Sequence, residues 1–349
     1  MNSYNSQSSP VQSSPVQSVI IPTYNRKDML AETISSVLKQ TQKSLEVIVV
    51  DDCSTDGTED FMKTITDERV RYIRCEKNRG VELNLSYALG QIRGEFVSFI
   101  AQDDYYTDYD FFSKAIKIFD EHKNDSEPLV FVAANASWLF CNTGEMRQSD
   151  IGEPGRVKGI DYILKGNEYR KPYSTFPTVF RTETLRKAGF EHKMMFDTPT
   201  YYQAALFGDA WYIPDVIGVY RFHNDSLTLG YKHHPELEGR HYITVHENIK
   251  QWRFVRETLY NRVSHQKADS WYISGMLMLN NFYALSRPKL KDRMKVTAII
   301  LQESGFMPSL WKALMYRKSY SLLRNITPLR KFYRFLKYKC RGRPYPEDN

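Results

Sequence analysis

The chain has 349 residues, of which 42% are hydrophobic and 26% are charged, and its net charge is +7. This composition is typical of a globular protein of about two domains, and it excludes collagen-like, disordered and membrane-spanning classes for the bulk of the chain. The charge is uneven: residues 287–349 carry 16 Lys/Arg against 4 Asp/Glu, whereas residues 1–286 carry 32 against 37. We therefore expect a slightly acidic body followed by a cationic segment with an anionic partner.

Residues 1–17 are rich in Ser, Gln and Asn and repeat the run Ser-Ser-Pro-Val-Gln. They have neither the basic start nor the apolar stretch of a signal peptide, so we expect a disordered leader. The four cysteines are scattered without a C-x-x-C pair, which indicates reduced thiols and a cytosolic chain. No run approaches the roughly 18 apolar residues of a transmembrane helix.

From residue 18 onward, strand-like and helix-like segments alternate. Strands are expected at 18–22, 45–50, 70–73 and 96–100. Helices are expected at 27–40, from residue 56 onward, and at 81–91. The strands are β-branched runs, and the helices have apolar residues at helical spacing. This alternation predicts an α/β fold, a Rossmann-like and mostly parallel sheet flanked by helices.

The rest of the chain is expected to become helical. A strand is predicted at 129–140, an irregular aromatic passage at 169–181, and two small strands within 204–223. Helices are predicted at 235–259, 269–286, 290–304, 310–325 and 328–341. We place a boundary near residue 230, so that residues 18–230 form one domain and residues 231–349 form a helical, basic C-terminal region.

Three of the predicted strands end in polar segments, at 22–26, 51–57 and 102–105. Ligands bind such sheets at the carboxyl ends of their strands, so these segments should meet at one edge. The adjacent carboxylates of Asp103 and Asp104 would repel each other and lose hydration unless a cation lies there. Mg²⁺ or Mn²⁺ holding a diphosphate meets this need, and a solvated turn is the alternative. For Asp56 the alternative is a helix cap.

The order and spacing of these segments resemble the family 2 glycosyltransferases of the GT-A fold, over residues 18 to about 230. The matching segments are Ser18-Val-Ile-Ile-Pro-Thr-Tyr-Asn-Arg26, Val49-Val-Asp-Asp-Cys-Ser-Thr-Asp-Gly57, Asn78-Arg-Gly80, Gly94-Glu-Phe96 and Asp103-Asp104. The chain is similar to bacterial enzymes that build surface polysaccharides from nucleotide-sugar donors. The resemblance implies that residues 18–230 are a GT-A nucleotide-sugar-binding catalytic domain. It also implies inverting, metal-dependent transfer of a sugar to a glycan or lipid-linked acceptor.

The resemblance further implies a set of donor-binding residues. Tyr24 would offer a stacking face to the base, Asp52 would accept a hydrogen bond from a base N–H, and Arg79 would lie near the nucleotide. The full donor-binding set is Pro22, Thr23, Tyr24, Asn25, Arg26, Asp52, Arg79, Asp103 and Arg221.

For the metal, the resemblance implies that Asp103 holds the ribose and Asp104 ligates Mn²⁺ or Mg²⁺. Ala101 occupies the first position of the commoner pattern Asp-x-Asp-Asp, so Asp103 and Asp104 both stand as metal ligands. The run Tyr220-Arg-Phe-His223 resembles a recurring Tyr-Arg-x-His element of the family. It implies that Arg221 or His223 reaches the diphosphate or the metal and stabilises the leaving group. A structural histidine is the alternative for His223.

Inverting transfer needs a carboxylate that takes the proton of the acceptor hydroxyl. The family places this base at a helix start after a Gly-Phe loop, which here selects Asp197. The alternative role of Asp197 is a helix cap, and Glu191 and Asp209 are the substitute bases. The family often has Glu-Asp at this place, whereas this chain has the single aspartate.

The segment 328–341 predicts a helix at a bilayer interface, because its apolar and basic residues lie on adjacent faces. We expect it to bind an anionic membrane surface, which would place the protein in the cytoplasm at the inner face of the plasma membrane. A basic helix packed on the catalytic domain is the alternative. Nucleic acid is not an expected partner, because no nucleic-acid-binding motif accompanies the charge.

Two other functions are alternatives to this one. A nucleotidylyltransferase would need a Gly-rich, Arg-containing loop after the first strand, which residues 22–26 do not form. A catalytically inactive sugar-nucleotide or membrane-binding protein of the same fold is the remaining alternative. Ala101 and the single aspartate at 197 are the features in its favour.

Overall fold

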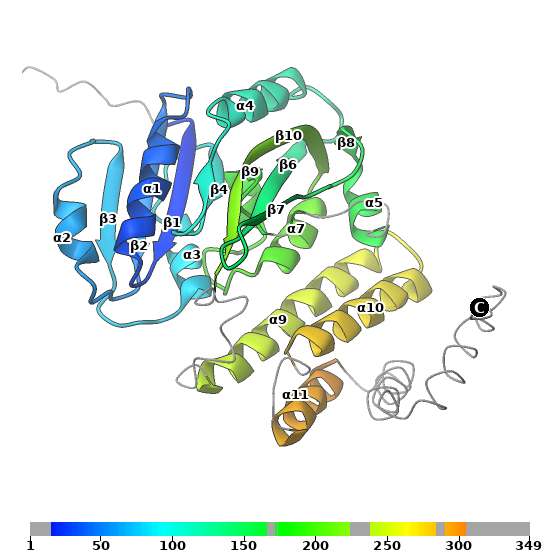
Figure 1. Ribbon diagram of the computed structural model, residues 1–349. Helices are drawn as coiled ribbons and strands as arrows, with labels where there is room; N and C mark the ends of the chain where they lie inside the picture. The colour runs from blue at the N-terminus through cyan, green and yellow to red at the C-terminus, as the bar shows by residue number, and fades with distance from the viewer. Residues whose placement is uncertain (1–14, 166–171, 173, 224–237, 284–289, 305–349) are drawn as a thin grey trace, which may run out of the picture. The chain divides into compact units, whose positions relative to one another are not determined.

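The computed structural model describes residues 15–165, 172, 174–223, 238–283 and 290–304. The chain forms two compact units that divide near residue 230. The first unit contains a ten-stranded sheet with its covering helices, and the second contains the helices α9, α10 and α11 (Figure 1).

One half of the sheet consists of four parallel strands. In spatial order they are β3 (Val70–Arg74), β2 (Leu45–Asp51), β1 (Gln17–Thr23) and β4 (Phe96–Phe99). The connecting helices are α1 (Lys27–Leu38), α2 (Thr58–Lys63) and α3 (Val81–Leu89). The predicted α/β alternation is confirmed here. Strand β1 includes the fully buried Gln17, so this residue belongs to the sheet, and residues 1–14 of the expected leader lie outside the described residues.

The other half mixes parallel and antiparallel strands. Its strands are β9 (Thr178–Arg181), β6 (Leu129–Phe140), β10 (Asp209–Phe222), β5 (Tyr105–Tyr106), β7 (Glu145–Gln148) and β8 (Gly155–Val157). Because β9 is antiparallel to both β4 and β6, strands β6 and β10 again run in the direction of β1. The prediction of two small strands within 204–223 is wrong, because the segment forms one strand, β10. Its pairing with β6 has register shifts between Asp209 and Val219.

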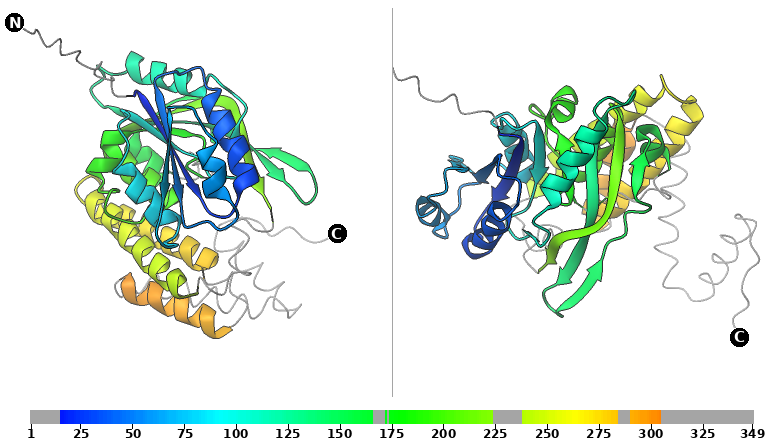
Figure 2. Two further views of the ribbon diagram at one scale, coloured as in Figure 1. Left: turned by 90° about the vertical axis from the view of Figure 1, so that its left-hand side faces the viewer. Right: turned by 90° about the horizontal axis from the view of Figure 1, so that it is seen from above.

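Helices cover both faces of the sheet (Figure 2). On one face, α1 and α4 (Phe111–Glu121) share a core with alternate residues of the strands, including Leu30, Phe111, Val19 and Val132. On the other face, α5 (Gly159–Leu164) and α7 (Asp197–Ala205) contact the sheet. Tyr201 of α7 contacts Phe131 of β6 there. The short helix α6 (Thr182–Lys187) follows β9.

The amino ends of the parallel strands are joined by the buried carboxylate of Glu46. It accepts hydrogen bonds from the Ser18 hydroxyl (2.7 Å), the Arg93 N–H (2.6 Å) and the Arg93 guanidinium (3.2 Å). Beside it, a Cβ atom on Gly94 would lie 2.5 Å from Oγ and 2.6 Å from N of Ser18, so only glycine fits there. The Gly94-Glu-Phe96 motif is therefore structural, and it lies at this amino edge.

The second unit consists, in its described part, of α9 (Glu238–Leu259), α10 (His265–Tyr283) and α11 (Leu290–Glu303). Their bounds lie close to three of the predicted helices. Trp252 of α9 packs against Gly275 of α10, where a Cβ atom would lie 2.2 Å from the indole ring. Among the described helices, none has the length and apolarity needed to cross a membrane. The helices predicted at 310–325 and 328–341 lie outside the described residues.

Candidate active site

The polar segments that follow β1, β2 and β4 meet at the carboxyl edge of the sheet. The backbone N–H of Asp52 donates to the carbonyl of Thr23 (2.9 Å). The side-chain oxygen of Gln102 accepts hydrogen bonds from Thr23 Oγ1 (2.5 Å) and from the Tyr24 N–H (2.7 Å). The structure thus brings together the three segments that the sequence marks as ligand-binding. Gln102 is the residue that ties two of them, and sequence reasoning gave it no role.

The loop after β1 is held in place by the loop after β2. Asn25 has φ = +51°, and its side-chain oxygen accepts a hydrogen bond from the Thr55 N–H (2.7 Å). The Asn25 N–H in turn donates to Ser54 Oγ (2.9 Å). The neighbouring Tyr24 is 45% exposed, so its ring presents a surface for stacking. Pro22 lies within β1, and Arg26 immediately precedes α1.

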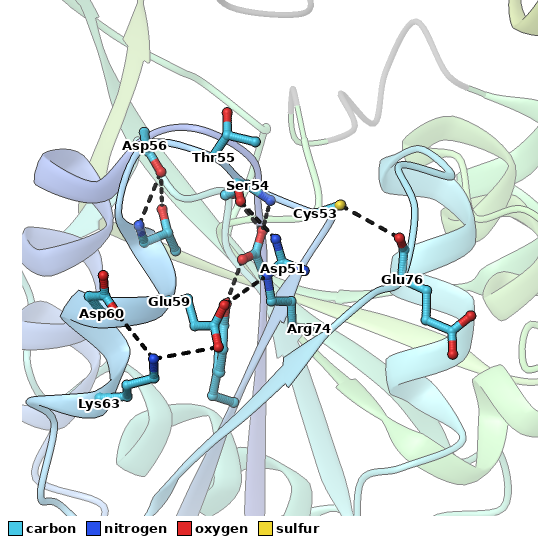
Figure 3. A network of polar contacts seen from close by, with 12 residues as sticks. Asp51, Cys53, Ser54, Thr55, Asp56, Glu59, Asp60, Lys63, Arg74 and Glu76 are labelled. Atoms are coloured by element: carbon cyan, nitrogen blue, oxygen red, sulfur yellow. Dashed lines mark hydrogen bonds and ion pairs between the residues drawn. The ribbon is translucent and has the colours of Figure 1, made fainter.

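The two aspartates after β2 have different partners. Asp51 is fully buried and accepts hydrogen bonds from Ser54 (2.9 Å from N, 2.5 Å from Oγ) and from the Tyr72 hydroxyl (2.5 Å), so it fixes the loop (Figure 3). Asp52 accepts hydrogen bonds from the backbone N–H groups of Arg79 (2.7 Å) and Gly80 (2.9 Å). Asp52 therefore holds the turn before α3 in place.

Two other residues of this edge contact their neighbouring helices. Asp56, labelled in Figure 3, accepts a hydrogen bond from the Thr58 N–H (3.2 Å) at the start of α2. It also accepts one from the Lys27 N–H (3.0 Å), so its role is structural. The Arg79 side chain donates to Asn84 Oδ1 (2.6 Å), and its guanidinium lies over the Tyr87 ring at 4.4 Å. Arg79 is thus anchored on α3 beside the loop that Asp52 holds.

Asp104 is a buried carboxylate with one oxygen held and the other without a partner. Its side chain is 1% exposed, and Oδ1 accepts a hydrogen bond from the Arg221 N–H (2.9 Å). In the part of the chain that the structure describes, Oδ2 has no hydrogen-bond partner. Burial raises the pKa of Asp104 well above its ordinary value, and the charges of Asp103 and Asp197 raise it further. A divalent cation would give Oδ2 the partner that it lacks.

His223 lies next to the acidic pair. Its Nε2 is 2.8 Å from Oδ2 of Asp103, and both side chains are largely buried. The described residues hold no cluster of three or more His, Cys, Asp or Glu side chains arranged around one metal ion. Asp104, Asp103 and His223 offer oxygen and imidazole ligands of the right kind, so they fit a cation that takes its remaining ligands from a bound diphosphate.

Asp197 is the first residue of α7 and faces the same site. Its Oδ1 accepts hydrogen bonds from Thr175, 3.3 Å from the backbone N and 3.2 Å from Oγ1. One helical turn later, the Tyr201 hydroxyl donates to the carbonyl of Ser174 (3.0 Å). The side chains of Asp197 and Tyr201, both on α7, therefore hydrogen-bond to the same segment, residues 174–175. The charge of Asp197 is one of the causes that raise the pKa of Asp104.

The two substitute bases lie away from this edge. Asp209 begins β10 beside Leu129, at the amino end of the parallel strands, and it accepts hydrogen bonds from the Gly159 N–H (3.0 Å) and from Arg156 (2.8 Å). Glu191 forms an ion pair with Arg186 (2.9 Å). Both carboxylates have structural partners, and Asp209 lies at the wrong edge of the sheet for a base.

Residues 18–196 match the family model described as glycosyl transferase family 2. The chain belongs to glycosyl transferase family 2. The resemblance seen in the sequence motifs is therefore confirmed. The five segments that carry it lie in the strands of the sheet or at its amino and carboxyl edges.

Two curated relatives illustrate the similarity. One is the GalNAc(5)-diNAcBac-PP-undecaprenol beta-1,3-glucosyltransferase of Campylobacter jejuni, 29% identical over 220 residues, which are 62% of this chain and 68% of that protein. The other is the UDP-Glc:alpha-D-GlcNAc-diphosphoundecaprenol beta-1,3-glucosyltransferase WfaP of Escherichia coli, 38% identical over 89 residues. This second match covers 26% of this chain and 36% of WfaP.

A solved structure shows the same fold as this family 2 chain. The crystal structure of S. aureus TarS 1-349 in complex with UDP-GlcNAc has a TM-score of 0.63 and 20% sequence identity. The match covers 95% of this chain and 93% of that one. The predicted GT-A architecture with a helical C-terminal region is thereby confirmed at the level of the fold.

Proposed function

We propose that this chain is an inverting glycosyltransferase that moves a sugar from a nucleotide-diphosphate donor to a glycan or lipid-linked acceptor, in the synthesis of a cell-surface polysaccharide. The observation that carries the proposal is the buried Oδ2 of Asp104, without a partner among the described residues and faced by the charges of Asp103 and Asp197. The family membership and the lipid-linked substrates in the names of the two relatives support the reaction class.

The donor nucleotide would bind at the carboxyl ends of β1 and β2. Tyr24 stacks on the base, and its loop is already fixed by Gln102. The carboxylate of Asp52 has about four lone-pair sites, of which two hold the Arg79 and Gly80 N–H groups, so it retains capacity for a base N–H. The loop around the base is thus ordered before the donor arrives.

The diphosphate would lie against Asp103, Asp104 and His223, which would hold Mn²⁺ or Mg²⁺. When bound, the cation supplies positive charge that stabilises the leaving nucleoside diphosphate. Asp104 contributes Oδ2, because its other oxygen is engaged by the Arg221 N–H. The desolvated carboxylate is a strong ligand, because burial and the charges of Asp103 and Asp197 outweigh the opposing charge of Arg221.

Asp197 would take the proton of the acceptor hydroxyl as that oxygen attacks the anomeric carbon. Thr175 donates two hydrogen bonds to Oδ1 and so fixes the orientation of the carboxylate. The amino terminus of α7, where Asp197 lies, favours the negatively charged form that a base requires.

The segment beyond α11 would bring this site to a membrane. Residues 305–349 contain 11 Lys/Arg and 2 Asp/Glu, a balance that favours anionic lipid headgroups. Together with a lipid-linked acceptor, this charge supports a peripheral protein at the cytoplasmic face of the plasma membrane.

The test is the release of nucleoside diphosphate by the 349-residue chain from a panel of UDP- and GDP-sugars, with lipid-linked and glycan acceptors. We expect release that requires Mn²⁺ or Mg²⁺ and that falls sharply in Asp104→Asn and Asp197→Asn. Asp120→Asn, which changes an exposed aspartate of α4, is the matched control. Full activity of both site variants would refute the assignment. Donor binding without turnover would favour the inactive-protein alternative.

A further inference from the structure

Helix α1 contacts the turn formed by Gln102, Asp103 and Asp104. The hydroxyl of Thr33, a fully buried residue of α1, lies 2.8 Å from the carbonyl oxygen of Gln102 and 2.7 Å from that of Asp104. The carbonyl of Met29, one turn earlier on α1, is a third acceptor at 3.2 Å, so the single hydroxyl proton is shared. Thr33 therefore holds both ends of the three-residue turn that presents the carboxylates.

The middle carbonyl of this turn is held by Arg221, and Arg221 is held by α1. The guanidinium donates from Nη1 to the carbonyl of Asp103 (2.9 Å) and from Nη2 to the carboxylate of Glu32. It also lies over the ring of Tyr105 at 4.4 Å, and only 12% of the Arg221 side chain is exposed. The backbone N–H of the same residue donates to Asp104 Oδ1. One residue thus contacts both aspartates of the turn.

We propose that Glu32 is a positioning residue for the divalent cation. Through Arg221 it fixes the Asp103–Asp104 turn, while Thr33, its neighbour on α1, fixes the same turn directly. The proposal rests on the proposed function, because it assumes that this turn binds a metal–diphosphate. It gives Arg221 a role different from the one expected from the sequence: the guanidinium orients the metal ligands instead of binding the donor.

The geometry explains why a remote carboxylate matters to the cation. Asp104 has one oxygen anchored and one for the metal, so a small shift of the turn changes the direction of Oδ2. Residues that hydrogen-bond to metal ligands commonly change metal affinity by about 10- to 100-fold when they are mutated. Glu32 is 52% exposed and is not itself among the hydrogen-bond partners of Asp104, so its effect passes through Arg221.

The experiment measures Mn²⁺ retention directly, by electron paramagnetic resonance of free Mn²⁺ in the presence of UDP or GDP. We expect Glu32→Gln and Thr33→Val to raise the apparent Kd for Mn²⁺ about tenfold or more. Thr33→Ser keeps the hydroxyl and should restore the wild-type value. Glu68→Gln, the same change at an exposed position before β3, is the matched control. Thermal unfolding without metal should be similar in wild type, Glu32→Gln and Glu68→Gln.

Three results would overturn the proposal. Unchanged Mn²⁺ affinity in Glu32→Gln would show that Glu32 does not position the turn. Tighter UDP binding with unchanged Mn²⁺ affinity would show that Glu32 restrains Arg221 from the diphosphate. No Mn²⁺ retention by the wild type with either nucleotide would overturn the metal site itself. Sugar transfer is measured separately, by the release of nucleoside diphosphate. A failure of the proposed role of Glu32 can therefore be distinguished from a failure of the proposed function.

Discussion

The backbone N–H of Arg221 donates a hydrogen bond of 2.9 Å to Oδ1 of Asp104, although the two residues are 117 positions apart. The bond joins the end of β10 to the turn after β4. It occupies one carboxylate oxygen and leaves the other buried without a partner in the described part of the chain. We expect this arrangement to determine how the proposed cation binds Asp104.

Asp104→Asn is expected to remove the stabilisation that Mn²⁺ gives to the folded protein, because an amide cannot replace the charged ligand. A cation that binds only the folded state raises its unfolding temperature, so the wild type should show a Mn²⁺-dependent shift with UDP present. In EDTA at pH 8, the variant should be more stable than the wild type by on the order of 1 kcal/mol, since a buried carboxylate that Asp103 and Asp197 repel is gone. Thermal unfolding with Mn²⁺ and with EDTA measures both effects. A variant that keeps the Mn²⁺ shift would contradict the role of Asp104.

Asp197→Asn is expected to lower kcat by about 10²- to 10⁴-fold while donor binding is unchanged, because only proton transfer is lost. Initial rates of sugar transfer and a donor titration separate the two quantities. Asn can still accept the hydrogen bonds of Thr175, so the fold of α7 should persist. Loss of donor affinity with little change in kcat would instead identify Asp197 as a structural helix residue.

Glu46→Gln is expected to lower the free energy of unfolding by about 1–3 kcal/mol at pH 7, because two charge-assisted contacts to Arg93 and Arg71 are lost. Burial would raise the pKa of Glu46, but the hydrogen bonds from Arg93 and Ser18 outweigh it and hold the pKa below its ordinary value of 4.5. A lowered folded pKa means stability that is present above the ordinary pKa and is lost as the pH falls through the lowered one.

The difference in the free energy of unfolding between Glu46→Gln and the wild type should therefore narrow as the pH falls below the ordinary value of 4.5 and through the lowered pKa. Urea denaturation of both proteins at neutral and acidic pH tests this. A difference that stays constant down to the acid transition would show that the charge of Glu46 adds nothing beyond packing.

Gly94→Ala is expected to destabilise the first unit by about 1–3 kcal/mol, because the new methyl group would overlap the backbone of Ser18. Gly90→Ala is the control: its Cβ atom would lie 3.4 Å from the nearest atom, the carbonyl oxygen of Tyr87. Denaturant unfolding of the two variants makes the comparison. Equal stability would mean that β1 moves freely away from the loop before β4.

A chain truncated after Ser304 is expected to lose its binding to anionic liposomes, because the removed residues carry most of the C-terminal positive charge. Flotation with and without anionic lipid, at low and high salt, measures the effect. The described helices of the second unit are retained in this variant. Equal flotation of the truncated and intact chains would show that the basic segment does not bind membranes.

The parallel half of the sheet was predictable, because its strands are rich in β-branched and aromatic residues and alternate with segments of helical spacing. Strand β9 (Thr178–Arg181) was not predictable, because four residues are too few to show a period and they lie within an aromatic-rich passage. The site residues that follow strands were found from their spacing and from the family resemblance. Asp209 could be placed at the amino edge only with the direction of β10 in hand.

The supporting residues of the site were not visible in the sequence. Glu32 and Arg221 are 189 positions apart, and no local pattern predicts that an exposed helix residue holds an arginine at the end of the last strand. Tyr72 likewise reaches Asp51 because β3 pairs with β2 in one register. Such contacts follow from the topology of the sheet, so they become available only with the three-dimensional structure.

The contacts of Glu46 and Gly94 lie at one edge of the sheet, and the residues proposed for the reaction lie at the other. Mutations in the loops that follow β1 and β2 therefore leave the ion pairs of Glu46 with Arg71 and Arg93 intact. Within those loops, Asn25, Asp52 and Asp56 hold the backbone, whereas the Tyr24 ring is exposed. For protein engineering, Tyr24 is therefore a position to diversify, and Ser18, Glu46 and Gly94 are positions to keep fixed.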